Sequence, residues 1–239
     1  MFEMLHTAGI YIQNKEQLKI YVKHYMDSCK HCDVLGVWSG GMYTQAKPFY
    51  DLFHKLSPNT KEICSQALEP YYFMNNPEYK YNKVFEGKKV LIISSHLHSV
   101  NQQLHKQVHK KDIFSSDTEF YVYKPPQQNA GNTDGNPWIY HFNTMKQEIT
   151  ELSNEFDFDI ALISCGGFGM IISDFIFTQL NKSVMYIGGS LQLFFGIMGN
   201  RWRQNKKIIK NDLWINVLQE DIPLSIQKQS KLCENSCYW

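Results

Sequence analysis

The region that most constrains the fold is the stretch of residues 159–202, in which two strand–glycine turn–helix units follow each other directly. Asp159–Ser164 is a short apolar run of strand length, and Val184–Ile187 is a second one. Between them, Met170–Leu180 is apolar on nearly every side, which predicts a helix packed on a sheet and covered from outside. Asn181 is suited to end this helix in a left-handed conformation. The pattern predicts two consecutive parallel strands.

Glycines follow both strands at the point where a helix begins. Cys165–Gly169 follows the first strand, and the segment 188–190 opens a second helix, expected over Leu191–Ile197. Such turns place backbone N–H groups along one sheet edge, a geometry that favours a phosphate or diphosphate. Glycines at these places also serve simply to make the turn. The dinucleotide fingerprint is incomplete, because Ile172 stands where a third small residue belongs, which argues against an NAD enzyme.

Length and charge narrow the class of protein. The 239 residues suit one domain, for which we expect residues 1–220, followed by an irregular tail over 221–239. The formal net charge of +1 argues against a nucleic-acid binder. Neither a secretory signal nor a clean membrane-spanning run is recognisable, so we expect a soluble, cytoplasmic protein.

Two groups of residues are weak candidates for a metal site. The pairs Cys29/Cys32 and Cys233/Cys237 are a zinc alternative, but they lie at opposite ends of the chain. Residues 157–159 imitate an Asp-x-Asp metal motif. They precede their strand, and therefore lie at the edge opposite the glycine turns. We read them as the solvated start of a strand and assign no metal ligand to this chain.

Strands alternate with helices along the rest of the chain. Further strands are expected over 33–38, 62–65, 90–94 and 119–123, and further helices over 15–28, 44–56, 100–111 and 143–155 and near Trp214. This alternation predicts an α/β fold with a three-layer, mostly parallel, Rossmann-like sheet in a single domain. Residues 124–137, rich in Pro, Gly, Asn and Gln, are either a lid over the sheet edge or a disordered loop.

The carboxyl ends of all these strands should lie on one side of the sheet, because parallel strands share a direction. Four segments follow strand ends and should gather there: 38–40, 94–96, 166–167 and 188–190. Small residues, hydroxyls and an imidazole are what a nucleotide-type pocket needs. We call this predicted edge the rim.

Eight segments carry a family resemblance: Leu5–Gly9, Asp33–Trp38, Leu68–Tyr72, Glu86–Ile93, Phe158–Ala161, Ile187–Ile197, Gly199–Trp202 and Cys237–Trp239. Together they resemble a family of bacterial and viral proteins related to glycosyltransferases of the GT-D fold. The resemblance implies a nucleotide-sugar donor, a glycan or other acceptor, and a divalent cation, Mn or Mg. Family members usually begin with a strand carrying Arg-x-Gly-x-x-Glu, and the better-understood enzymes hold an acidic Asp-x-Glu metal motif there. Met1–Met4 supplies neither, so we expect a truncated, partnered or inactive chain.

Glycosyl transfer needs a cradle for the diphosphate, charge compensation for the leaving group and a base for the acceptor hydroxyl. Backbone N–H groups of six residues would form the cradle: Gly166, Gly167, Gly169, Gly188, Gly189 and Ser190. Arg201 would pair with phosphate, or would only satisfy carbonyls at the end of its helix.

Two residues are candidates for the catalytic base. His96 follows a strand, and Glu69 precedes a proline in a segment expected to reach the same rim. Either is also explained as a hydrogen-bonded structural residue. Trp38, Ser39 and Gln192 complete the predicted substrate-binding set, with Trp38 stacking on a base or ring and Gln192 touching base or sugar.

The leading prediction is a domain that transfers a sugar from a nucleotide-sugar donor. A non-catalytic nucleotide- or glycan-binding module is the first alternative, and metal-stimulated release of nucleoside diphosphate separates the two. A methyltransferase that uses S-adenosylmethionine is the second alternative, although the glycine turns of this chain come late and no acidic strand end follows them.

Overall fold

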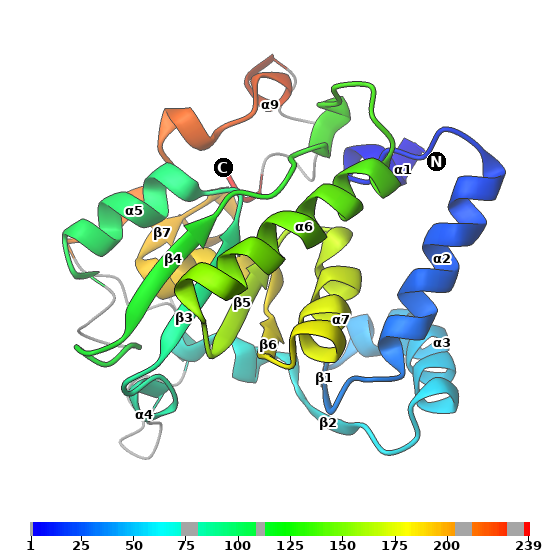
Figure 1. Cartoon of the computed structure of the whole chain (residues 1–239), viewed down its shortest axis with the longest axis horizontal. Helices are drawn as coiled ribbons and strands as arrows, with labels where there is room; N and C mark the ends of the chain where they lie inside the picture. Colours follow the sequence, from blue (N-terminus) through cyan, green and yellow to red (C-terminus); the bar gives the residue numbers. More distant parts are fainter. Residues whose placement is uncertain (1, 73–80, 109–112, 204–211, 229–236) are drawn as a thin grey trace.

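A four-stranded parallel sheet forms the centre of the protein (Figure 1). The computed structural model describes residues 2–72, 81–108, 113–203, 212–228 and 237–239. The strands are β3 (Lys89–Ser94), β4 (Glu119–Tyr123), β5 (Ile160–Ser164) and β6 (Ser183–Tyr186), in the spatial order β4-β3-β5-β6. The expected α/β fold with parallel strands is confirmed.

Two further strand pairs lie outside this sheet. β1 (Val34–Val37) and β2 (Lys61–Cys64) pair in parallel with each other, as do the two-residue strands β7 (Ile197–Met198) and β8 (Ile215–Asn216). The expectation that all strands share one sheet is therefore corrected. β1 instead packs on a following 3₁₀ turn, where a Cβ on Gly36 would lie 3.2 Å from Leu68 Cδ1.

Helices cover both faces of the central sheet. The α-helices are α1 (Phe2–His6), α2 (Lys15–Cys29), α3 (Gly41–Leu56), α4 (Tyr81–Val84), α5 (Leu97–His105), α6 (Trp138–Phe156), α7 (Phe168–Leu180), α8 (Asn200–Arg203) and α9 (Leu224–Lys228). The 3₁₀ helices are η1 (Ser65–Leu68), η2 (Pro70–Tyr72), η4 (Asn129–Gly131), η5 (Gly188–Phe195) and η6 (Gln219–Asp221). No helix in the described ranges is long and apolar enough to cross a bilayer.

Alternate residues of β3 feed two hydrophobic clusters. Val90 and Ile92 pack with α5 and η5 on one face, whereas Leu91 and Ile93 pack with α6 and α7 on the other. Figure 1 shows α6 and α7 across the front of the sheet. This two-sided burial explains why β3 and β5 read as unbroken apolar runs, and it establishes the three layers.

The helix ends test the local predictions. α7 ends where expected, because Asn181 caps it with a left-handed φ of 53°. The helix expected over 191–197 is wrong in type and extent: it is the 3₁₀ helix η5, which Gly196 ends at a φ of 65°. Trp214 is not helical but leads into β8, and its ring packs edge-on against Tyr71.

α5 and α6 also begin earlier than the periodicity predicted. α6 starts at Trp138 rather than at Asn143, and α5 starts at Leu97. The expected last turn of α5 falls partly on residues 109–112, outside the described part.

Two segments expected to be irregular pack on the body of the protein. Within 124–137, Gln128 is buried and accepts the Tyr11 N–H at 3.1 Å, so this loop is held against the N-terminal segment. Within 221–239, Ile226 and Trp239 belong to the hydrophobic core. The described part of the tail therefore belongs to the domain.

Candidate functional site

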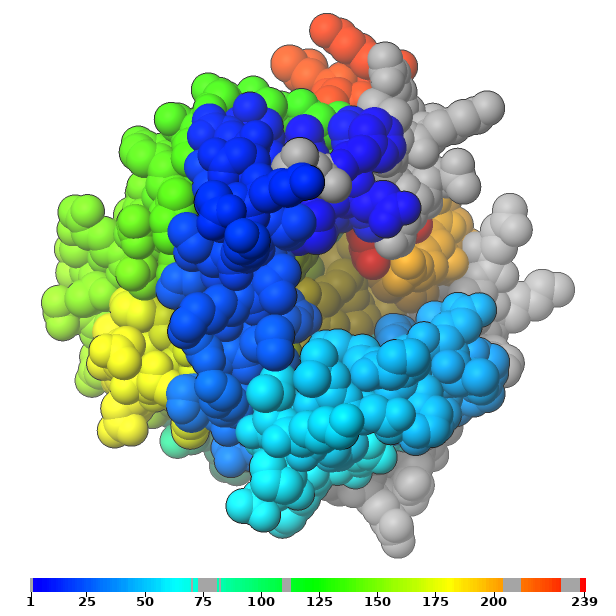
Figure 2. Space-filling model, turned by 90° about the vertical axis from the view of Figure 1, so that its right-hand side faces the viewer, coloured from blue at the N-terminus to red at the C-terminus, as the bar shows by residue number. Residues whose placement is uncertain are grey.

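A hollow opens where the carboxyl ends of β5 and β6 meet the N-terminal helices. Figure 2 shows it between α1, α2 and α3, with the chain around β6 and η5 at its floor. A pocket of about 530 Å³ occupies part of the hollow, and its floor includes Gly166, Gly167 and Tyr186. The predicted rim therefore borders a concave surface.

The first glycine turn is filled by the protein itself. The Gly167 N–H donates to Ala8 O at 2.7 Å, and a Cβ on Gly167 would lie 2.5 Å from Ile10 Cγ1. A Cβ on Gly169 would collide with the Tyr186 ring, and one on Gly166 would lie 2.6 Å from Ala8 O. Close packing of the N-terminal segment accounts for Gly166 and Gly167, and the Tyr186 ring accounts for Gly169. The Gly167 amide is already engaged.

The second glycine turn is partly open. Gly188 has a φ of 69°, and no atom of the described residues lies within 4 Å of where its Cβ would be. Gly189 instead packs against the ring of Tyr238. The Ser190 side chain is buried and donates to Ile187 O at 3.2 Å. Among the described residues of this turn, Gly188 is the one with open space at its Cβ position.

Gln192 occupies a core position instead of the ligand-facing one expected from the sequence. Its side chain is 1% exposed and its Nε2 donates to Ile197 O at 3.2 Å. A 3₁₀ helix has fewer residues per turn than an α-helix, so the side chains of η5 are rotated away from where an α-helix would present them.

The segment 237–239 packs along the rim. Asn200 N–H donates to Trp239 O at 3.2 Å, and Arg201 N–H donates to Cys237 O at 3.0 Å. The backbone of Tyr238 also lies against Gly199, where a Cβ would come within 2.6 Å of its carbonyl carbon. The residues that end the family resemblance therefore form one wall of the site.

His96 lies at the end of β3, as expected, but beneath this wall. Its side chain is 4% exposed, and its Nε2 lies 3.2 Å from Tyr238 O. A carbonyl only accepts, so Nε2 carries the proton. Burial lowers the pKa of His96, against an opposing contribution from the Asp221 carboxylate. Contact between His96 and a substrate would require 237–239 to move.

This buried imidazole makes a testable contribution to acid stability. Since the pKa of His96 is lower in the folded than in the unfolded chain, the unfolded chain binds more protons as the pH falls. The contribution of neutral His96 to stability is fully present above the ordinary histidine pKa of about 6.5 and is lost as the pH falls below it. We expect His96→Gln to flatten the fall in melting temperature between pH 7.5 and 5, and exposed His98→Gln to leave it unchanged. Equal slopes in all three proteins would contradict this.

Glu69 and Arg201 form the charged part of the rim. The Glu69 carboxyl is half-buried, and this burial raises its pKa, although the Arg201 charge and a hydrogen bond from the Tyr72 hydroxyl partly oppose the rise. The Arg201 guanidinium lies 4.8 Å from the centre of the Tyr238 ring. The Tyr238 ring also packs against Gly189, three residues after Tyr186, so Arg201 and Tyr238 lie next to the pocket floor.

The segment just after the end of β1 is exposed. Trp38 is 44% exposed, and its backbone N–H donates to the Tyr50 hydroxyl at 3.0 Å. Ser39 and Gly40 are also exposed. The Trp38 indole is therefore accessible. Tyr186 and Tyr238 also contribute to the site, but the sequence analysis, which considered residues at strand ends, did not predict them. The terminal Cys-Tyr-Trp motif was the available signal for Tyr238.

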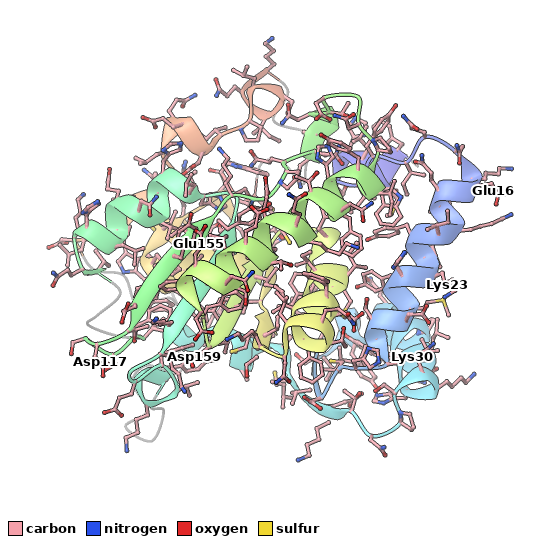
Figure 3. The ribbon with its side chains drawn as sticks, viewed as in Figure 1. Glu16, Lys23, Lys30, Asp117, Glu155 and Asp159 are labelled. Atoms are coloured by element: carbon pink, nitrogen blue, oxygen red, sulfur yellow. The ribbon has the colours of Figure 1, made fainter. Side chains whose placement is uncertain are left out.

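The described residues do not present a donor set for a divalent cation. No group of three His, Cys, Asp or Glu residues that could hold a metal occurs among them. Glu69 already has the positively charged Arg201 side chain beside it. Asp159 accepts the Lys89 N–H at 2.8 Å and lies at the opposite end of the sheet (Figure 3). Of the four cysteines of the zinc alternative, Cys233 lies outside the described residues.

Comparison with known proteins identifies the family. The sequence model described as "GT-D fold-like domain" matches residues 3–194, which include the strands of the central sheet, Trp38, Glu69 and both glycine turns. No curated protein and no solved structure matches the chain. Because the match covers most of the sequence, the chain belongs to the GT-D-like family.

Proposed function

We propose that this protein is a glycosyltransferase domain that binds a nucleotide sugar in the hollow and transfers its sugar to a glycan or another acceptor. The observation that carries the proposal is the Glu69 carboxyl, whose raised pKa suits a base, held beside Arg201 at the strand ends. Membership in the GT-D-like family supports it.

Each group has a role in the proposed reaction. The acceptor hydroxyl gives its proton to the Glu69 carboxylate as its oxygen bonds to the sugar carbon. The bond from that carbon to the diphosphate breaks, and Arg201 and the N–H of Gly188 hold the charge that develops on the leaving group. Trp38 stacks on the nucleotide base or the sugar ring.

The charges of Glu69 and Arg201 couple the binding of the donor to the basicity of Glu69. Arg201 lowers the pKa of Glu69 in the free protein. A diphosphate that takes over part of the Arg201 charge reduces this effect, so donor binding makes Glu69 a stronger base. The donor thus prepares the base that the acceptor needs. No step is assigned to a metal, because the described residues do not fit one.

Nucleotide binding at Arg201 is the first expected result. One of UDP, GDP, CMP or dTDP, tested with and without manganese, should raise the melting temperature by several degrees when present at 100 times its dissociation constant. Arg201→Gln should weaken that binding roughly tenfold or more, because a charge-assisted hydrogen bond to phosphate is lost. Thermal unfolding at a series of nucleotide concentrations measures both effects.

Two matched controls locate the site. Arg203→Gln removes the same charge from the same short helix and should leave affinity unchanged. Trp38→Ala should weaken binding, whereas Tyr121→Ala, equally exposed on the far edge strand β4 (44% against 42%), should not. The proposal would be contradicted if none of the four nucleotides raised the melting temperature.

A non-catalytic nucleotide- or glycan-binding module is the second candidate. The observation favouring it is the occupied first glycine turn, which leaves fewer amides for a diphosphate than a full cradle offers. Release of nucleoside diphosphate from nucleotide sugars decides between the two, since only the transferase shows it. The family match lends no support to the methyltransferase alternative.

A further inference from the structure

The pocket of about 530 Å³ beside the rim has an apolar lining that the proposed donor site does not use. It lies between α2 and α3, and Figure 2 shows the hollow that it shares. Val22, Phe49 and Leu52 border it and remain partly exposed. A pocket of this volume is in the range that small-molecule ligands occupy.

Two tyrosine hydroxyls and the Gly167 amide at its floor are already engaged. The Tyr21 hydroxyl donates to Gly167 O at 2.9 Å, and the Tyr186 hydroxyl donates to Gly166 O at 2.8 Å. The Gly167 N–H is used by Ala8 O. Within the described part of the chain, the Tyr25 hydroxyl is the lining hydroxyl without a hydrogen-bond partner.

This arrangement selects the chemistry of an occupant. A sugar ring or a peptide backbone entering the pocket would leave several of its own donors and acceptors unpaired, which opposes binding. A hydrocarbon chain has no such groups and gains by leaving water. The Tyr25 hydroxyl offers one polar anchor to such a molecule.

The pocket lies next to the charged rim. Its floor residue Tyr186 lies three residues before Gly189, against which the Tyr238 ring packs, and the Tyr238 ring lies 4.8 Å from the Arg201 guanidinium. A molecule with an apolar chain in the pocket can therefore place a polar end beside Arg201 and Glu69.

We propose that the pocket between α2 and α3 binds the hydrocarbon chain of an amphiphilic acceptor, whose polar head then lies at the rim. The acceptor role rests on the proposed function, whereas the binding of a hydrocarbon chain does not.

The test uses the full chain and three simple probes. Isothermal titration calorimetry with 1-hexanol, 1-octanol and 1-decanol should show saturable binding, with affinity rising about fourfold per methylene, which corresponds to about 0.8 kcal/mol. Each step of two carbons should therefore strengthen binding roughly sixteenfold.

A pair of variants on α2 locates the bound chain. Val22→Asp places a charge at the pocket and should weaken decanol binding on the order of tenfold or more. Ile20→Asp makes the same change two residues away, at a side chain that is as exposed (49% against 44%) and does not line the pocket. It should bind like the wild type. Leu52→Asp on α3 repeats the test from the other wall.

The outcomes separate this inference from the proposed function. Absence of saturable alkanol binding, no dependence on chain length, or equal losses in Val22→Asp and Ile20→Asp would overturn the pocket assignment. Chain-length-dependent binding in a protein that shifts with no nucleotide would support the pocket and reject the nucleotide-sugar site. Nucleotide binding without alkanol binding would do the reverse.

Discussion

Asp221→Ala should lower the free energy of unfolding by about 2–4 kcal/mol, among the largest effects expected of a single substitution in this chain. Asp221 is 1% exposed, and its carboxylate caps the start of α5 from a distant part of the sequence. Oδ1 accepts the His98 N–H at 3.1 Å. Oδ2 accepts both the N–H and the hydroxyl of Ser99 at 2.7 Å.

The size of this effect follows from what the substitution leaves behind. Alanine would strand three buried or half-buried donors at the positive end of a helix dipole. A chain of this length loses roughly 2–4 °C of melting temperature per kcal/mol, so a fall of about 5–15 °C is expected. Asp221→Asn keeps an acceptor but removes the charge and should give a smaller loss.

Thermal or urea unfolding of the wild type and the three variants tests the cap. Glu220→Ala is the matched control, because Glu220 is the exposed neighbour of Asp221 in the same 3₁₀ helix and should be close to neutral. A loss in Asp221→Ala no greater than that in Glu220→Ala would show that the carboxylate is not a stabilising cap.

Glu69→Gln should lower the rate of sugar transfer by about 10²–10⁴-fold, the usual contribution of a general base. Glutamine keeps the size of the side chain but cannot accept the acceptor proton. Nucleotide affinity should stay equal or rise, because Arg201 loses its competing carboxylate. The expected signature is therefore a fall in kcat without weaker donor binding.

The pH dependence gives a second readout of the same residue. A base must be deprotonated, so wild-type activity should fall as the pH decreases through the raised pKa of Glu69. Glu69→Gln should lack this acidic limb. Glu155→Gln, an exposed change on α6 (Figure 3), should retain both the rate and the limb. If activity still falls at low pH in Glu69→Gln, this fall is due to the titration of another group.

Local patterns predicted much of the fold. β3 and β5 were recognisable because burial on both faces of the sheet requires a continuous apolar run. The end of α7 was recognisable because a left-handed cap favours Asn or Gly, and Asn181 adopts that conformation. These features depend on a few neighbouring residues.

The site was predicted less well, because its residues are brought together over long sequence separations. The first glycine turn has the same local sequence whether its amides face a phosphate or Ala8. Only the packing of the N-terminal segment settles that the Gly167 N–H is engaged. Likewise, His96 follows its strand as predicted, but contact with Tyr238 determines that it is buried.

The sequence by itself therefore determined the α/β class, the central strands and the family, since each is recorded in local apolar patterns or short motifs. The tertiary structure alone decided which rim residues stay accessible. It separated β1 and β2 from the central sheet, placed the Asp221 carboxylate at the start of α5, and set Glu69 beside Arg201. The physical reason is that accessibility and pKa depend on the surroundings contributed by distant segments, which no local pattern encodes.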